Sequence, residues 1–283
     1  MNREQQLQWE ARWRLPAAIA AFAAGATLLV SGLLFVPEDR KGIESNPDFL
    51  LSVDEQSGAY LTAAVLAATG ALIVIGVFLY LFRASFARGA AVPSWFLYLV
   101  VGAPIVYAVS TVWATLDVID IADEFAGGSP IRGDAGTDRA RDIGGSAALL
   151  LGLSTAGTIG LAFLFVMLPL RARRVGLLTP FMGILGVVVG ALIVFRAQFP
   201  GLATVVQAFW LGALGVLLLG RWPGGRGPAW ASGRAEPWPT AAQRRGVVPM
   251  PGEEEEGPEL DPTPPEPEPV PQRPKSRKRR GKR

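Results

Sequence analysis

The chain has 283 residues, half of them apolar, a formal net charge of +3, and neither a cysteine nor a histidine. Without these two residue types it has no disulfide, no zinc site built from them, no thiol nucleophile and no imidazole for acid–base catalysis. The apolar residues gather into nearly uncharged runs of about twenty residues, the length with which a helix crosses a bilayer.

The N-terminal segment 1–15 is polar but carries Trp9 and Trp13 one helical turn apart. Tryptophan favours the boundary between membrane and water, so we interpret this segment as a short interfacial helix and both tryptophans as anchors. The first apolar run follows at 16–36. No small-residue cleavage site ends this run, so we interpret it as a span and not as a cleavable signal peptide.

Five further runs raise the expected number of membrane-spanning helices to six and predict an all-α, polytopic transmembrane helix bundle. The third run holds Pro104, where a kink is expected. It is also predicted to continue beyond the membrane as a helix with Asp117, Asp120 and Glu124 on one face. The expected spans are 16–36, 59–82, 93–116, 146–168, 177–195 and 201–219.

The loops between these runs alternate in charge. The two loops after the second and fourth runs are basic, whereas the loops 37–58 and 117–145 carry an acidic excess. Because Lys and Arg near span ends are retained on the cytoplasmic side, both termini are predicted to be cytoplasmic. The basic loop residues are Arg83, Arg88, Arg171, Arg173 and Arg174.

The centres of the expected spans hold no charged side chain, which makes a proton-coupled pump an unfavoured interpretation. Arg196 lies at the end of the fifth span, where its side chain is expected to extend to the interface. Gln207 is expected to make a hydrogen bond between helices. Small residues four apart predict close packing within the bundle, with a homo-oligomer as the alternative.

After the last span the composition changes. Trp222, Trp230 and Trp238 recur every eight residues among arginines, and we interpret them as anchors along the cytoplasmic leaflet, or alternatively as a peptide motif for a partner. The expected organisation is an interfacial segment 1–15, a transmembrane domain 16–220 and a disordered, Pro/Glu-rich cytoplasmic tail 221–283.

The tail ends in a strongly basic run, KSRKRRGKR. Such a run attracts anionic lipid headgroups or RNA, and a cytoplasmic protein is a further expected partner. The alternative is a tail that only supports topology and solubility. The candidate polyanion-binding residues are Lys275, Arg277, Lys278, Arg279, Arg280, Lys282 and Arg283.

Two basic hairpins resemble each other, because Gly89 and Pro93 match Gly176 and Pro180 at one constant offset. Glycine ends a helix and proline begins one, so the likeness indicates either a shared turn type or a duplication. The run RARRVGLLTPFMGILGVVVGAL at 171–192 and the motifs GRWPGGRGPAW and GRAEPWPT at 220–240 resemble an uncharacterised, mainly actinobacterial family of multi-pass membrane proteins. This resemblance implies a bacterial inner membrane and brings no known activity or site residues.

From these observations we expect a non-enzymatic integral membrane protein with no catalytic residue, cofactor or metal, whose basic tail contacts anionic lipid, RNA or a protein. The alternative is a small-solute transporter or channel. It is motivated by the proline at 104, the glycine-rich spans and the similar hairpins.

Overall fold

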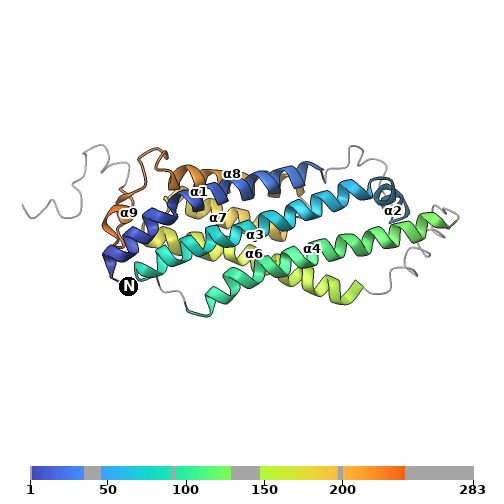
Figure 1. Cartoon of the computed structure of the whole chain (residues 1–283), viewed down its shortest axis with the longest axis horizontal. Coiled ribbons are helices and arrows are strands. Elements are labelled where there is room, and N and C mark those ends of the chain that lie inside the picture. Colours follow the sequence, from blue (N-terminus) through green and yellow to red (C-terminus); the bar gives the residue numbers. More distant parts are fainter. Residues whose placement is uncertain (1, 35–45, 91–92, 129–146, 197–199, 240–283) are drawn as a thin grey trace, which may run out of the picture. The chain divides into compact units, whose positions relative to one another are not determined.

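The structure, a computed structural model, describes residues 2–34, 46–90, 93–128, 147–196 and 200–239. The chain divides into two units, 1–238 and 239–283. Apart from Pro239, every described residue belongs to the first unit. All regular elements in the described residues are helices, which confirms the predicted all-α bundle (Figure 1).

Six apolar helices pack side by side in the first unit, and two short helices lie at its ends (Figure 1). α3 contacts α1 on one side and α4 on the other, while α6 contacts α4 and α7, and α8 contacts α1 and α7. The bounds are α1 Arg3–Leu34, α2 Asn46–Glu55, α3 Ser57–Ala87, α4 Phe96–Gly127, α6 Ala147–Arg174, α7 Pro180–Val194, α8 Pro200–Leu218 and α9 Pro228–Ser232.

Five of the described helices, α1, α3, α4, α6 and α8, are long and apolar enough to cross a membrane. The fifth predicted span, 177–195, corresponds to α7, which is apolar but has only 15 residues. At about 1.5 Å per residue a helix of this length rises about 22 Å, less than the hydrocarbon thickness of about 30 Å. The multi-pass prediction is therefore confirmed, with one helix shorter than expected.

The predicted interfacial segment 1–15 is not a separate helix. α1 continues without a break from Arg3 through Pro16 to Leu34, so the segment forms the first turns of the same helix. Helices in membranes tolerate an internal proline when neighbouring helices compensate for the lost hydrogen bond. The boundary predicted between segment and span is thus only a change in composition along one continuous helix.

Small residues bring the helices into close contact, as their four-residue spacing predicted. A Cβ atom placed on Gly25 would lie 3.2 Å from the carbonyl oxygen of Ala208, and one on Gly190 would lie 2.7 Å from that of Ala162. The separation at Gly190 is shorter than real Cβ atoms show, and the one at Gly25 is tighter than nine in ten real Cβ contacts. These glycines therefore set the distances between α1 and α8 and between α6 and α7.

The two similar hairpins share one type of helix end. Gly89 and Gly176 both have a positive φ, of 76° and 79°, which glycine adopts at little cost. The amides of Ala90 and Leu177 each donate to a carbonyl five residues earlier, the pattern of a Schellman cap. The predicted role of these glycines as helix terminators is confirmed, and Gly220 ends α8 in the same way.

The extension of α4 beyond the expected span is also confirmed. Ala122 and Phe125 are fully buried against Leu50 and Val53 of α2. At the edge of this contact Asp54 of α2 faces Asp123 of α4. Desolvation and a hydrogen bond between these side chains raise the pKa of Asp54 above its ordinary value of 3.8.

This raised pKa predicts that α2 packs on α4 more firmly in acid. Protonated Asp54 is favoured in the packed state, so the destabilising effect of its charge is absent below the ordinary pKa and complete above the raised one. Hydrogen–deuterium exchange of the α2 amides, corrected for intrinsic exchange, should show protection that is greatest below the ordinary pKa of 3.8 and falls as the pH rises through the raised pKa. Asp54→Asn should abolish this dependence, whereas Asp48→Asn should retain it; a dependence that survives Asp54→Asn contradicts the assignment.

Candidate functional site

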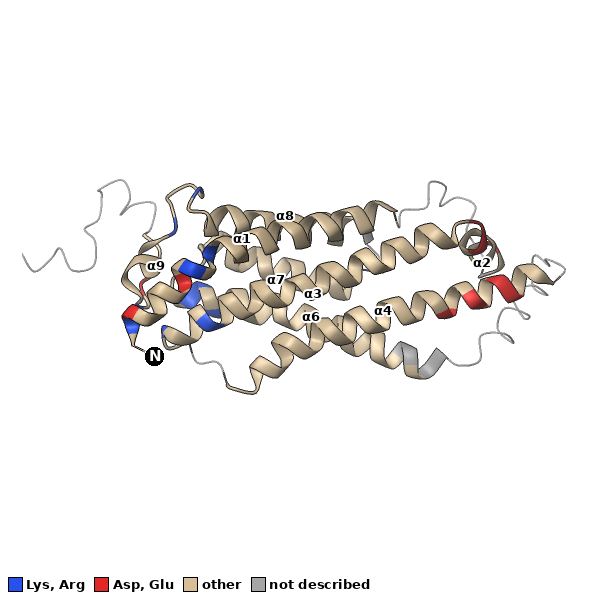
Figure 2. Ribbon diagram, viewed as in Figure 1, with Lys and Arg blue, Asp and Glu red and all other residues tan. Residues whose placement is uncertain are grey.

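Charge is distributed unequally between the two ends of the helices. Figure 2 shows basic residues around the start of α1, the end of α3 and the segment before α9, whereas α2 and the last turns of α4 are acidic. The predicted separation of basic and acidic loops thus places the charges at opposite ends of the helices. We call the first of these the basic end; its described arginines are Arg3, Arg12, Arg14, Arg83, Arg88, Arg171, Arg173, Arg174, Arg221, Arg226 and Arg234.

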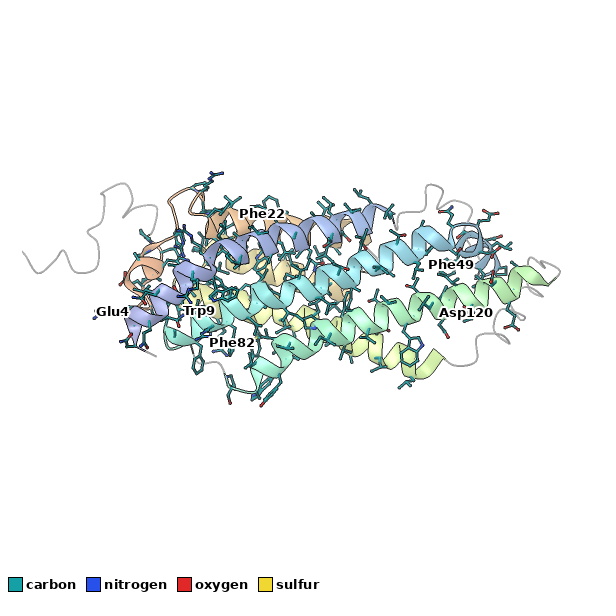
Figure 3. The ribbon with its side chains drawn as sticks, viewed as in Figure 1. Glu4, Trp9, Phe22, Phe49, Phe82 and Asp120 are labelled. Carbon is teal, nitrogen blue, oxygen red and sulfur yellow. The ribbon has the colours of Figure 1, made fainter. Side chains whose placement is uncertain are left out.

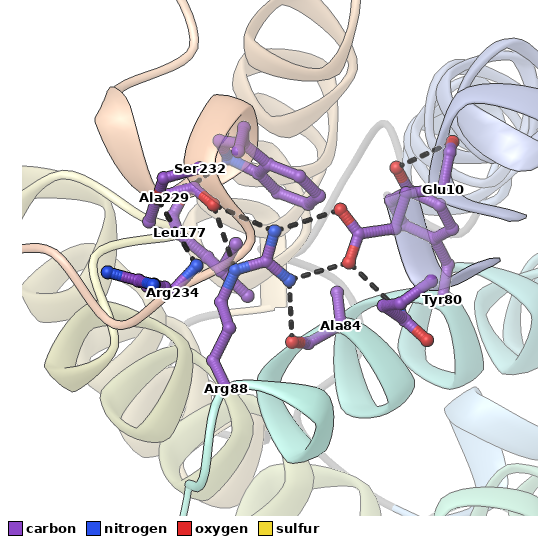
Figure 4. Close-up of polar contacts among 10 residues, drawn as sticks. Glu10, Tyr80, Ala84, Arg88, Leu177, Ala229, Ser232 and Arg234 are labelled. Atoms are coloured by element: carbon purple, nitrogen blue, oxygen red, sulfur yellow. Dashed lines mark hydrogen bonds and ion pairs between the residues drawn. The ribbon is translucent and has the colours of Figure 1, made fainter. Parts of the chain in front are cut away.

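The basic end is built around a buried ion pair between Glu10 of α1 and Arg88 at the end of α3. The two guanidinium NH groups of Arg88 lie 2.6 and 2.9 Å from the two carboxylate oxygens of Glu10, a bidentate arrangement (Figure 4). Their side chains are 0% and 3% exposed. Gln6 also donates to the Glu10 carboxylate at 2.9 Å. The pair is therefore both shielded from water and hydrogen-bonded on several sides.

Arg88 also attaches the segment that follows α8. Its Nε and one terminal nitrogen donate to the carbonyl oxygen of Ala229 at 3.0 and 2.8 Å, and a further bond goes to Ala84 (Figure 4). A charge removed from water is costly unless it is paired and hydrogen-bonded, and here every nitrogen of the guanidinium has a partner. One side chain thus connects α1, α3 and α9.

Aromatic rings surround this pair. Tyr80 lies between Trp9 and Trp230, with ring centroids 5.5 and 5.8 Å away and the planes nearly parallel. Arginines lie over both indoles, Arg83 at 4.4 Å from the Trp9 centroid and Arg226 at 4.8 Å from that of Trp230. Such cation–π contacts gain strength when they are withdrawn from water, so the stack holds positive charge at this end.

The predicted tryptophan anchors occupy different environments. Trp13 is 49% exposed, so its predicted role as an interfacial anchor stays a prediction. Trp230 is only 4% exposed and its indole nitrogen donates to the carbonyl oxygen of Leu177 at 2.9 Å, so it is a core residue and not a lipid anchor. Trp222 stacks on Phe181, and Trp238 packs against Gly227.

The segment 221–238 consequently belongs to the helical unit and not to the tail, where it was predicted to lie. A Cβ atom on Gly176 would overlap the carbonyl oxygen of Glu236, which shows how closely this segment covers the hairpin between α6 and α7. Burial lowers the pKa of Arg226 in the same segment. The candidate polyanion-binding residues of the tail, 275–283, lie outside the described residues.

No family model, curated protein or solved structure matches the chain. The interpretation of the site therefore rests on its own residues. Glu10 is buried and already paired with Arg88, a state that suits a structural contact and not proton transfer. We call the contact of Glu10, Arg88 and the carbonyl of Ala229 the clamp. Among the described residues, no group of three or more acids could hold a metal ion.

Beside the clamp lies a groove between α1, α3 and α4, with a volume of about 600 Å³. Its walls are mainly apolar and include Trp13, Ala20, Gly76 and Leu79, with Arg83 at its basic end. Trp9 and Phe82 also line it and lie toward the same end of the bundle (Figure 3). A groove of this composition accepts a hydrocarbon chain in preference to a polar solute.

The sequence analysis made predictions for two polar residues of the spans, Gln207 and Arg196. Gln207 is buried at 5% exposure, and its predicted hydrogen bond between helices stays a prediction. Arg196 does not simply extend to the interface: its guanidinium is partly buried and donates to the hydroxyl of Tyr107 on α4. Because α7 is short, Arg196 at its end can make a hydrogen bond to the middle of the longer helix α4.

The clamp is the feature that sequence reasoning missed. Glu10 was one acid among polar residues, and Arg88 was one of several arginines marking a cytoplasmic loop. The two are 78 positions apart, and no local pattern pairs them. The one signal present was an acid in a segment that also carries several arginines.

Removing one charge of the clamp should destabilise the basic end. Glu10→Gln leaves the Arg88 guanidinium buried without its counter-ion, and a change of this kind costs about 3–5 kcal/mol. We expect a lower free energy of unfolding in detergent and faster amide exchange in α9. The change Glu4→Gln, at an exposed position on the same helix, is the matched control and should stay within about 0.5 kcal/mol. Equal effects of both substitutions would refute the clamp.

Proposed function

We propose that the protein is a non-enzymatic, multi-pass protein of a bacterial inner membrane that holds a basic tail at the cytoplasmic surface, where the tail contacts anionic lipid headgroups. The observation that carries this proposal is the clamp of Glu10, Arg88 and Ala229. It fixes the residues that precede the tail, so the tail starts from a rigid support. A chain held in this way keeps its charges at high local concentration near the membrane.

The charge of the two ends supports the proposed orientation. Arginine is concentrated at the end that carries the start of α1 and the segment 221–238, and the positive-inside rule assigns that end to the cytoplasm. The cytoplasmic leaflet has a negative surface potential that attracts basic segments near it. Basic residues of the bundle and of the tail would then face the same anionic surface.

Anionic lipid is the favoured partner over RNA because it is always adjacent. Each basic residue near an anionic surface contributes about 1 kcal/mol, and the tail carries seven within 275–283. RNA would be attracted by the same charges, but it would have to reach the membrane from solution. Solute transport has less support, because the groove beside the clamp is lined mainly by apolar side chains.

The absence of cysteine allows a direct test of the orientation. Single cysteines are introduced as Ser57→Cys at the acidic end of α3 and as Ser276→Cys in the tail. In intact cells a membrane-impermeant maleimide should label position 57, whereas position 276 should react only after the cells are opened. Labelling of position 276 in intact cells contradicts cytoplasmic termini.

The tail is tested by replacing its seven basic residues with glutamine, which keeps the length of the chain. The protein in neutral-lipid nanodiscs should bind phosphatidylglycerol vesicles, and this binding should fall steeply in the substituted variant. It should also weaken with salt, which screens exposed charges beyond about 10 Å at 0.1 M.

Two controls accompany that measurement. A tail with the same residues in scrambled order should bind equally well, because the attraction depends on charge and not on sequence. Phosphatidylcholine vesicles should not bind either form. Unchanged binding after charge removal would end the proposal, and a loss of RNA binding alone would assign the tail to nucleic acid.

A further inference from the structure

The segment 221–238 contains a partly buried arginine, Arg226, whose hydrogen-bonding groups are not all satisfied. Its guanidinium lies 4.8 Å from the ring centroid of Trp230, and its side-chain carbons lie beside Gly220. Its Nε is shielded from water and has no hydrogen-bond partner. Shielded polar atoms in proteins are normally hydrogen-bonded, and a charged donor left unbonded is especially costly. Arg226 therefore lacks an acceptor.

The charges around Arg226 are also unbalanced. The hydroxyl of Tyr80 feels the charges of three arginines and one acid, namely Arg14, Arg88, Arg226 and Glu10. Both carboxylate oxygens of Glu10 are already engaged by Arg88. Burial, together with repulsion from the other two arginines, lowers the pKa of Arg226. Within this cluster of described residues, Arg14 and Arg226 thus leave two positive charges without a counter-ion.

Trp238 adds a second unsatisfied donor to the same segment. Its ring packs against Gly227, the residue after Arg226, and its shielded indole nitrogen has no hydrogen-bond partner. Indole and guanidinium nitrogens can only donate, so the segment needs a ligand that accepts hydrogen bonds. Arg14 is exposed, which leaves the cluster open to a ligand on the side of α1.

A phosphate group fits this cluster better than other anions do. It offers several acceptor oxygens and up to two negative charges, and the planar fork of arginine binds it through two parallel hydrogen bonds. A halide has no such geometry, and a carboxylate has only one charge. Arg14 also lies directly before the apolar run 16–36, the level at which headgroup phosphates meet a membrane-spanning helix.

We propose that Arg226 and Arg14 bind one phosphate group at the basic end, carried either by a phospholipid headgroup or by a phosphorylated solute. The inference goes beyond the proposed function, because it concerns a fixed site in the helical unit and not the basic run of the tail. The bound phosphate supplies the acceptor for Arg226 and balances both charges. Binding should therefore stabilise the folded protein.

The first arm of the test uses the full chain in a maltoside detergent, which contains no phosphate. The unfolding temperature is measured in inorganic phosphate and in chloride at equal ionic strength. A ligand that binds only the folded state raises this temperature as its concentration rises. Arg226→Gln should weaken the apparent affinity at least about tenfold, the effect of one charge-assisted hydrogen bond. Arg14→Gln should also weaken it.

The second arm identifies the source of the phosphate. Native mass spectrometry of the same detergent-solubilised chain is run with phosphatidylglycerol or with diacylglycerol of identical acyl chains, which lacks the phosphate. Retention of one phosphatidylglycerol but no diacylglycerol, lost in Arg226→Gln, supports the site with a lipid ligand. A response to inorganic phosphate without retained lipid supports the site with a phosphorylated solute.

Two controls separate the site from general charge effects. Arg234→Gln removes an exposed arginine from the same segment and should leave both responses unchanged. The tail with seven glutamines should also keep both responses, so this proposal and that of the tail can fail independently. Without phosphate, Arg226→Gln should unfold at the same or a higher temperature than the unmodified chain, because it removes a partly buried charge that has no counter-ion.

Three results would overturn the inference. The first is an unmodified chain that responds neither to inorganic phosphate nor to phosphatidylglycerol. The second is an equal loss of response in Arg226→Gln and Arg234→Gln, which would show only a general attraction to positive charge. The third is a lower unfolding temperature of Arg226→Gln without phosphate together with an unchanged response to both ligands, which would leave Arg226 as a packing partner of Trp230 alone.

Discussion

The burial of one ion pair constrains the whole basic end. Glu10 and Arg88 are both shielded from water, and neither charge is tolerable there without the other. Their contact therefore fixes where α1 lies along α3, because a shift of one turn would separate the carboxylate from the guanidinium. Since Arg88 also binds the carbonyl of Ala229, the same constraint determines where the chain returns after α8.

The rest of the bundle shows why such a pair is located at the end of the helices. In the hydrocarbon region, apolar packing between helices competes with equally apolar lipid, so close contact depends on small residues such as Gly25 and Gly190. This packing sets distances well but allows helices to slide. At the interface, water is partly excluded and a charged pair gains strength. The contact of Glu10 with Arg88 therefore fixes how α1 is aligned along α3, which apolar packing alone does not fix.

The sequence predicted what depends on local pattern. The length of apolar runs identified five long helices, glycine identified the ends of α3 and α6, and the helical period identified the apolar face of α4 around Phe125. What it missed depends on partners distant in the chain. The sequence around Trp230 is typical of an interfacial anchor. In the structure Trp230 is instead a core residue, because its indole nitrogen donates to the carbonyl of Leu177 and its ring stacks on Tyr80. α7 was assigned a full span because its flanking residues are apolar too.

The two ends of the helices are held by contacts of different strength, and this difference bears on function. The basic end has a bidentate ion pair, stacked rings and a covering segment, so its helices are fixed relative to one another. The acidic end holds α2 on α4 through a small apolar cluster, and the nearby carboxylates of Asp54 and Asp123 repel each other unless a proton is shared. A rigid, positively charged end supports the proposed contact with an anionic surface, because its arginines are held in place. The packing of α2 on α4 at the acidic end can change without moving the arginines of the basic end. The clamp holds α1 and α3 together at the basic end, whatever happens at the other end of the helices.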